Sequence, residues 1–320
     1  MRRPTRFLSR WPNRFALGLL AVFVVVAAAA PALSPMDPKE PGVFKRVGRV
    51  TDLNPHPPDD KALLGTLPGQ VDVFHALVWG TRGALAFGVV VALGALLLGA
   101  IVGAVAGYAG GPVNNLLMRT TDAFLAFPLI AAVALVQQMV AMTIQSMGGT
   151  YWFHSPFAGM NIYFDFTPPL WTRFLMSVDP VMICLILLLW VPYARLFNTQ
   201  VLTLKRSDFV RAAYSLGGGP AWVIRRHLLP NALRPALVMV ATDIGAVVIL
   251  QATFTFIGLG GNSAWGKLLS IGRDWVIGPG GDVLRYWWVF VPATLAVILF
   301  GVTWNMLGDG LHDALDPRRG

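Results

Sequence analysis

Six apolar stretches, each long enough to cross a lipid bilayer as a helix, constrain the fold of this chain more than any other feature. They cover residues 15–33, 84–108, 121–142, 181–199, 236–259 and 287–307. A helix rises about 1.5 Å per residue, so about 20 apolar residues span the roughly 30 Å hydrocarbon core of a bilayer. Only 13% of the residues are charged and 55% are hydrophobic, a balance that would leave a water-soluble domain with too apolar a surface. We therefore expect an all-α membrane protein with six transmembrane helices.

The first apolar stretch has an alternative interpretation as a cleavable secretory signal. Basic residues precede it, and Ala30-Pro31-Ala32 follows its apolar core. The core is longer than that of most signals, and its removal would leave five spans, which would break the agreement between charge and topology. We expect residues 15–33 to be kept as the first transmembrane helix.

Basic residues gather at two places, and their placement predicts the topology. One is the N-terminus, residues 1–14, and the other is the loop between the fourth and fifth apolar stretches, residues 200–235. Six crossings place both on one side with the tail, residues 309–320, and the positive-inside rule makes that side the cytoplasm. The basic excess, 25 Lys and Arg against 16 acidic residues, therefore indicates membrane lipid rather than nucleic acid, since no basic patch is interleaved with aromatic residues.

Two segments then fall on the opposite, periplasmic side. Residues 34–83 would form a loop followed by a helix that leads into the core. Residues 148–180 are rich in aromatic side chains and contain Pro168-Pro169, so they predict an external insertion rather than a further span. Two interpretations of this insertion stay open: an ordered lid, or an aromatic belt that rests at the lipid headgroups.

Small residues recur along the second span at helix-packing intervals. Gly99, Gly103 and Gly107 are four residues apart, and Gly94 and several alanines accompany them. This spacing places small residues on one helix face, where a second backbone can approach closely. The pattern favours ordinary packing within a bundle over a direct contact with a substrate.

Motifs for chemistry are not present in the sequence. It has no P-loop, no His-Glu-x-x-His and no nucleophile elbow, and its single cysteine excludes a disulfide within the chain. The histidines are scattered over the loops, which does not favour a metal site; they are His56, His75, His154, His227 and His312. We expect a protein that is not an enzyme and that binds no cofactor.

The loop at residues 206–235 carries the most specific pattern. A helix capped by Ser207 or Asp208 would run to Leu216 and stop at the glycines 217–219. Pro220 would open a second helix, residues 221–229, and Pro230 would end it. Two short helices joined by a glycine elbow are typical of a docking element, although a solvated amphipathic loop is the simpler alternative.

The same loop resembles a family signature. Ala212 and Ala213 are followed, at the family's spacing, by Gly217 and then by Leu229-Pro230. This order is similar to that of the membrane permeases of binding-protein-dependent ABC importers, in particular the second permease of dipeptide, oligopeptide and nickel systems. Arg211 stands where the general signature has Glu and His227 where it has an apolar residue, as in the peptide-permease version. Outside the loop the chain departs from the family at Leu67, Val71 and Gln251, where Asp, Arg and Glu are usual.

This resemblance implies a type I ABC importer permease fold with a cytoplasmic coupling helix and a core at residues 84–308. It also implies the partners: a second homologous permease, two ATP-binding subunits that hold ATP and Mg, and a periplasmic or lipid-anchored solute-binding protein. The location would be the bacterial inner membrane, with both termini in the cytoplasm. Dipeptides, longer peptides, nickel complexes and peptide-like antibiotics all stay open as substrates.

An ATP-independent secondary transporter or channel is the alternative, but no inverted repeat is evident and only Asp122 and Asp243 place carboxylates near or inside a span.

Two groups of candidate site residues follow. For coupling to an ATPase, the candidates are Arg211, Ala212, Ala213, Tyr214, Leu216, Gly217, Trp222, His227, Leu229 and Pro230. Among them Tyr214, Leu216 and Trp222 are the expected apolar anchors, and Gly217 is expected to permit a close approach of backbones. For the translocation pathway, polarity alone selects Asp243, Gln251 and Thr255.

Overall fold

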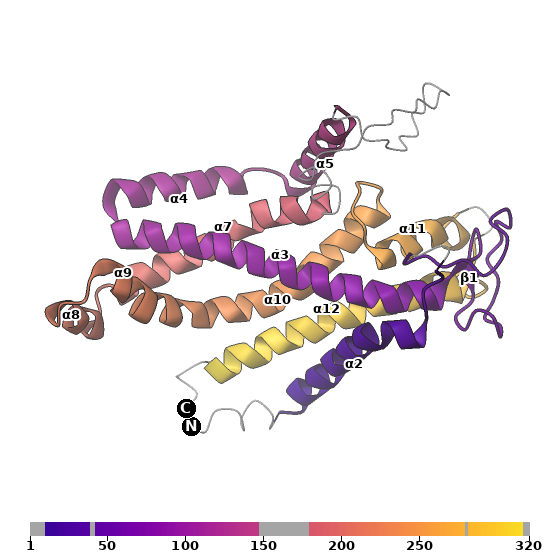
Figure 1. Ribbon diagram of the computed structural model, residues 1–320, viewed down its shortest axis with the longest axis horizontal. Coiled ribbons are helices and arrows are strands. Elements are labelled where there is room, and N and C mark those ends of the chain that lie inside the picture. The colour runs from indigo at the N-terminus through magenta and orange to yellow at the C-terminus, as the bar shows by residue number, and fades with distance from the viewer. Residues whose placement is uncertain (1–9, 39–41, 147–178, 279–280, 316–320) are drawn as a thin grey trace.

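The computed structural model describes residues 10–38, 42–146, 179–278 and 281–315, and within them the chain is a bundle of long helices (Figure 1). Five helices are long and apolar enough to cross a membrane: α2 (Trp11–Leu33), α3 (Val73–Ala109), α7 (Pro180–Leu204), the helical stretch Pro220–Phe256 that contains α10 (Leu229–Phe256), and α12 (Trp287–Leu315). The predicted helical membrane fold is confirmed. The predicted insertion at 148–180 lies outside the described residues apart from Asp179 and Pro180.

The third apolar stretch is not one straight helix. It divides into α4 (Gly111–Leu125) and α5 (Leu129–Ser146), which meet at an angle of 88°. The predicted span at 121–142 is wrong in placing a continuous helix across this break. The cause is Pro128, because a proline disfavours the helical conformation of the residue before it, here Phe127. Counting the bent pair as one span gives six crossings.

The centre of the bundle is the close contact of α3 with α7. A Cβ atom added at Gly99 would lie 2.6 Å from the carbonyl oxygen of Trp190, and one added at Gly107 would lie 2.9 Å from that of Asn198. Only glycine therefore allows these two backbones to approach so closely. The prediction that the small residues of the second span serve helix packing is confirmed.

A short hairpin that the sequence analysis did not predict begins α3. Strands β1 (Thr66–Leu67) and β2 (Val71–Asp72) pair antiparallel, and Gly69 and Gln70 in the turn have positive φ. The Asp72 side chain caps α3 by accepting from the Phe74 and His75 backbone N–H groups. Since α3 has 37 residues and a length of about 55 Å, the helix that leads into the core and the second span are one element.

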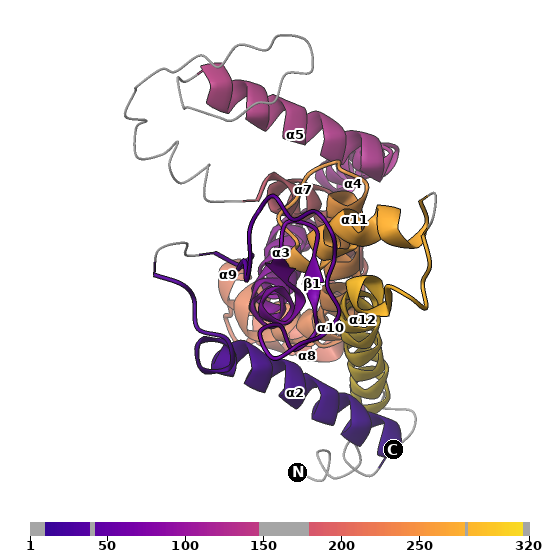
Figure 2. The ribbon, with the colours of Figure 1, turned by 90° about the vertical axis from the view of Figure 1, so that its right-hand side faces the viewer.

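The hairpin lies at one end of the bundle, against α11 (Ala264–Val276) and α12, as Figure 2 shows from that end. The opposite end carries α8 (Asp208–Ser215) and α9 (Pro220–Val223). The first residues of α2 and the last of α12 also lie toward the α8 end, where Arg10 pairs with Asp313. We call these the hairpin end and the α8 end.

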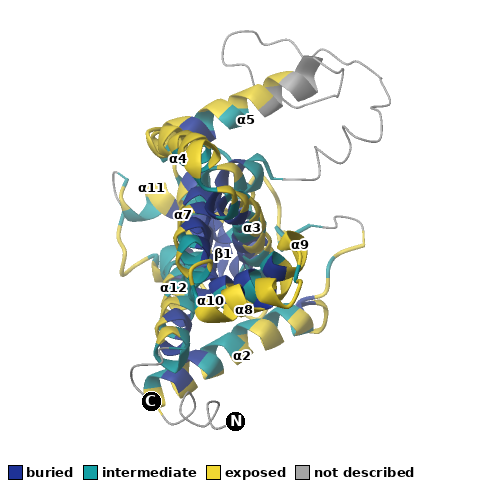
Figure 3. Cartoon of the chain, turned by 90° about the vertical axis from the view of Figure 1, so that its left-hand side faces the viewer, coloured by how far each residue is buried: buried dark blue, intermediate teal, exposed yellow. Residues whose placement is uncertain are grey.

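Burial follows the pattern expected of a bundle surrounded by lipid. Seen from the α8 end, buried residues gather between α3, α7 and α10, whereas the outward faces of α2, α4 and α5 are largely exposed (Figure 3). Large apolar residues are exposed on these faces, as Val22 and Val25 of α2 and Leu135 of α5 illustrate. Lipid tails are the solvent that suits such faces.

Candidate functional site

Helix α8 begins and ends as its sequence predicts. Ser207 occupies the N-cap position, where its hydroxyl donates to the Leu204 carbonyl at 2.5 Å and makes no capping bond to α8, and Asp208 places an acidic group in the first turn. At the other end the Gly217 N–H donates to the Tyr214 carbonyl at 2.9 Å and the Gly218 N–H to the Ala213 carbonyl at 3.0 Å. This pair of bonds is a Schellman motif, which requires the positive φ that Gly217 adopts, +83°.

Gly217 is glycine for its backbone conformation and not for packing within this chain. No atom lies within 4 Å of the place where its Cβ would be. Gly218 is the crowded position, because a Cβ there would lie 2.7 Å from the Ala213 carbonyl oxygen. Close approach of another protein to Gly217 stays a prediction.

The second predicted helix does not end at Pro230, and this prediction is wrong. Helix α9 continues through a π turn, Ile224–Leu228, directly into α10. The Leu229 N–H donates to the Ile224 carbonyl, five residues back, which widens the helix just before the proline. Pro230 has no N–H to donate, so a wider turn at this point lets the helix continue where a regular one would be broken.

The inner side of this element is fixed to the bundle. Its buried residues form an apolar cluster with the ends of α3 and α7: Ala104, Val201, Val210, Ala213, Val223 and Leu228. The small size of Ala213 is therefore explained by packing inside this chain, where it is buried. The Tyr214 hydroxyl adds a hydrogen bond to the Tyr108 hydroxyl at the end of α3, with the oxygens 2.9 Å apart.

The same tyrosine pair is flanked by a cation. Lys205 Nζ donates to the Tyr108 carbonyl at 2.6 Å and lies 4.9 Å from the centre of the Tyr108 ring. Burial, and then the bond to Tyr108, raise the pKa of Tyr214 to about 12. The phenol therefore stays neutral at physiological pH, and the contact between α8 and α3 is kept.

The outer side of the element is an open apolar hollow of about 620 Å³, which we call the α8 hollow. Its lining residues are Phe209, Ala212, Ala213, Leu216, Gly217, Gly218, Gly219, Trp222 and His227. Leu216 is 89% exposed and Trp222 is half exposed. The His227 ring stands edge-on to that of Trp222 at 4.9 Å, and its Nε2 is buried without a hydrogen-bond partner in the part of the chain described.

The segment that carries this hollow also carries four arginines, which are not among the lining residues. Arg206, Arg211, Arg225 and Arg226 are all exposed. Arg211 pairs with Asp208 only at 3.9 Å, and such exposed pairs contribute little to stability. The element therefore presents an apolar hollow and, close to its lining residues in the sequence, exposed cationic side chains.

The structure brings together six of the ten coupling candidates: Ala212, Ala213, Leu216, Gly217, Trp222 and His227 line the α8 hollow. Four others do not line it. Tyr214 turns to α3, Arg211 and Pro230 are exposed, and Leu229 is partly buried against the bundle. Phe209 lines the hollow but was not among the candidates, although its spacing of three and seven residues from Ala212 and Leu216 marks one helix face.

The three pathway candidates do not share one site. Asp243 accepts a hydrogen bond from the Tyr193 hydroxyl at 2.7 Å. Thr255 donates to the Gln251 carbonyl at 2.9 Å and accepts from the Ser263 N–H at 3.3 Å, so it holds the turn after α10. Gln251 alone lines a cavity, at the hairpin end, where it donates to Asp179.

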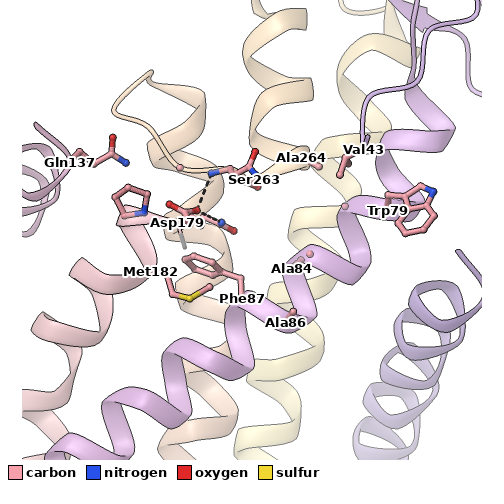
Figure 4. Close-up of a pocket in the computed structure, with 16 residues that line it drawn as sticks. Val43, Trp79, Ala84, Ala86, Phe87, Gln137, Asp179, Met182, Ser263 and Ala264 are labelled. Atoms are coloured by element: carbon pink, nitrogen blue, oxygen red, sulfur yellow. Dashed lines mark hydrogen bonds between the residues drawn. The ribbon is translucent and has the colours of Figure 1, made fainter. Parts of the chain in front are cut away.

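That cavity, which we call the Asp179 pocket, has a volume of about 520 Å³ (Figure 4). It lies between α3, the first turn of α7, α10 and the turn before α11. The two hollows therefore occupy opposite ends of the same long helices.

Comparison with known proteins decides the family. Residues 80–320, well over half of the chain, match the model of binding-protein-dependent transport system inner membrane components. The chain belongs to this family. It is accordingly a multi-pass inner-membrane permease, a translocation subunit of an ABC importer, and not an enzyme.

Relatives of this permease extend over nearly its whole length. It is 28% identical to a putative peptide transport system permease protein of Brucella suis over 98% of the chain and 90% of the relative. It is 28% identical to the dipeptide transport system permease protein DppC of Bacillus subtilis, over 96% of the chain and 82% of the relative. It is 27% identical to the nickel transport system permease protein NikC of Escherichia coli, over 97% of the chain and 95% of the relative.

Proposed function

We propose that this permease forms half of the translocation pathway for peptides or related solutes, and that the α8 hollow is where an ATP-binding subunit docks. The names of the relatives support the solute class, since they include peptide, dipeptide and nickel systems. The α8 hollow supports the docking site. ATP and Mg would be held by the partner subunits.

The docking proposal rests on an exposed apolar surface that contact with lipid does not explain. Leu216 and Trp222 are exposed, and α8, which Leu216 directly follows, lies beyond the ends of α3 and α7 (Figure 1). Exposed apolar residues with a polar rim are typical of protein interfaces. The exposed arginines of the same segment favour an acidic surface on the partner.

The connection of α8 to the bundle gives docking a mechanical consequence. The apolar cluster and the bond between Tyr108 and Tyr214 join α8 to the ends of α3 and α7. A displacement of the docked subunit would therefore move the packed α3–α7 pair as one body. Movement of this kind alternates access of the pathway to the two sides of the membrane.

The remaining assembly follows from this proposal. A second homologous permease would close the pathway, and two ATP-binding subunits would dock at the α8 end. That end, with the N- and C-termini, would be cytoplasmic in agreement with its arginines. A periplasmic or lipid-anchored solute-binding protein would deliver the solute at the hairpin end.

Leu216 provides the most direct test by mutation. The Leu216→Glu variant places a charge in the apolar hollow without altering any contact inside the bundle. Loss of an interface anchor costs about 2 kcal/mol or more, so we expect retention of the ATP-binding subunits to fall about 30-fold or more. Nucleotide-driven uptake should be lost with it.

Leu53→Glu is the matched control, because Leu53 is 67% exposed at the hairpin end. It should retain the ATP-binding subunits as well as the wild type does. Normal assembly of Leu216→Glu would refute the docking proposal. Uptake by a wild-type assembly without any ATP-hydrolysing subunit would favour the alternative, an ATP-independent transporter.

A further inference from the structure

The Asp179 pocket has two chemically different walls. One is formed by α3 and α7 and is apolar or small, with Gly83, Ala84, Phe87 and Met182 (Figure 4). The other is polar and comes from α5, α10 and the turn before α11, with Gln137, Gln251 and Asn262. Its volume, about 520 Å³, is within the range of about 300–1,000 Å³ that is usual for small-molecule sites.

Asp179 is the one ionisable residue among those that line the pocket in the described part of the chain. Arg82 lies 5.8 Å from the centre of the Trp79 ring and is not part of the lining. Among the described residues, the pocket lining therefore carries one negative charge and no positive charge. This balance favours a ligand with a cationic group.

The Asp179 carboxylate is held in place by three donors. One oxygen accepts from the Val181 N–H at 2.9 Å and caps α7. The other accepts from Gln251 Nε2 at 2.8 Å and from the Asn262 N–H at 3.0 Å (Figure 4). A carboxylate has about four acceptor positions, so one is left for a donor that enters the pocket. A carboxylate fixed in this way is preorganised for binding.

We propose that the Asp179 pocket binds the ammonium group of a small peptide in transit, with Asp179 as the anion that receives it. The amides of the polar wall would face the peptide group, and Phe87 and Met182 would face an apolar side chain. This proposal rests on the proposed function for the solute class, and it adds a binding site on the permease itself.

A cysteine-protection experiment tests the site in the complete importer. The chain has a single natural cysteine, Cys184, which is buried. Gly83→Cys places a thiol in the pocket, where nothing lies within 4 Å of the added Cβ. Its rate of maleimide labelling is measured in lipid nanodiscs with alanyl-alanine or with N-acetyl-alanyl-alanine. Val50→Cys, exposed in the loop before the hairpin, is the control that neither peptide should protect.

We expect alanyl-alanine to protect Gly83→Cys at a concentration at least about tenfold lower than the acetylated peptide, since a hydrogen bond to a charged group is lost on acetylation. Adding Asp179→Asn should remove this difference. Asparagine caps a helix as well as aspartate does, so α7 should keep its first turn.

Equal protection by the two peptides, no protection by either, or a difference that survives Asp179→Asn would each overturn the proposal. The comparison of the two peptides needs no change at Asp179, so it decides the matter even if that variant fails to assemble. Nucleotide-driven uptake by the wild-type importer is measured in parallel. Its absence would count against the proposed function, whereas equal protection with normal uptake would count against this site alone.

Discussion

The hydroxyl groups of Tyr108 and Tyr214 lie 2.9 Å apart and join the last turn of α3 to α8. At its other end α3 contributes Trp79, Gly83 and Phe87 to the Asp179 pocket. One continuous helix, Val73–Ala109, therefore connects the proposed docking site with the proposed solute site. This connection gives a direct structural route between the two.

Removal of the hydrogen bond between Tyr108 and Tyr214 should weaken the coupling of transport to ATP hydrolysis more than it weakens the binding of the ATP-binding subunits. Tyr214→Phe keeps the ring and loses the hydroxyl, at a cost of about 0.5–1.5 kcal/mol. We expect the number of solute molecules transported per ATP hydrolysed to fall up to about tenfold while the ATP-binding subunits are retained. Tyr108→Phe should have the same effect, and the double variant should be no worse than either single one. Unchanged coupling in Tyr214→Phe would show that the bond plays no part.

The glycines after α8 form a matched pair. Gly217 has a φ of +83° and Gly219 a φ of −73°, and neither has an atom within 4 Å of an added Cβ. Gly217→Ala should destabilise the end of α8 by about 1–2 kcal/mol, because an L-residue is strained at positive φ. Gly219→Ala should be neutral or slightly stabilising. Limited tryptic cleavage after Arg211 measures both, and equal cleavage would contradict the backbone explanation.

The contact between α3 and α7 should tolerate no added side chain. A Cβ at Gly103 would clash with the Ala194 carbonyl group and lie 2.8 Å from the Phe197 Cβ, whereas one at Gly18 of α2 would meet nothing within 4 Å. We expect Gly103→Ala to cost about 1–3 kcal/mol and Gly18→Ala to cost nothing. Thermal denaturation of the purified permease measures the difference. Similar melting temperatures would show that α3 and α7 can move apart without loss of stability.

Sequence patterns predicted the elements that depend on local chemistry. Helix α8 follows from its acidic first turn and its glycine end, and the spans other than the bent α4–α5 pair follow from apolar length. The hairpin was missed because its strands are only two residues long, although Pro68-Gly69 is a turn signal. The π turn before Pro230 was missed because proline alone predicts a break, and a wider turn can offset it.

Which residues form each candidate site is determined by the helix faces that meet in space. Leu216 and Trp222 were predictable because they flank the glycine elbow, but the burial of Ala213 and the turn of Tyr214 to α3 come from packing on distant segments. Asp179 was not a candidate, since it lies 72 residues before Gln251 in the sequence and no local pattern joins them. Only the fold places these two side chains together.

Cross-linking from position 216 tests the central claim most directly. A photoreactive benzoylphenylalanine is placed at Leu216 or, as control, at Leu53 in the assembled importer, and the partner in each adduct is identified by mass spectrometry. We predict that position 216 captures the ATP-binding subunit and that position 53 does not. Capture from 53 and none from 216 would contradict docking at the α8 hollow.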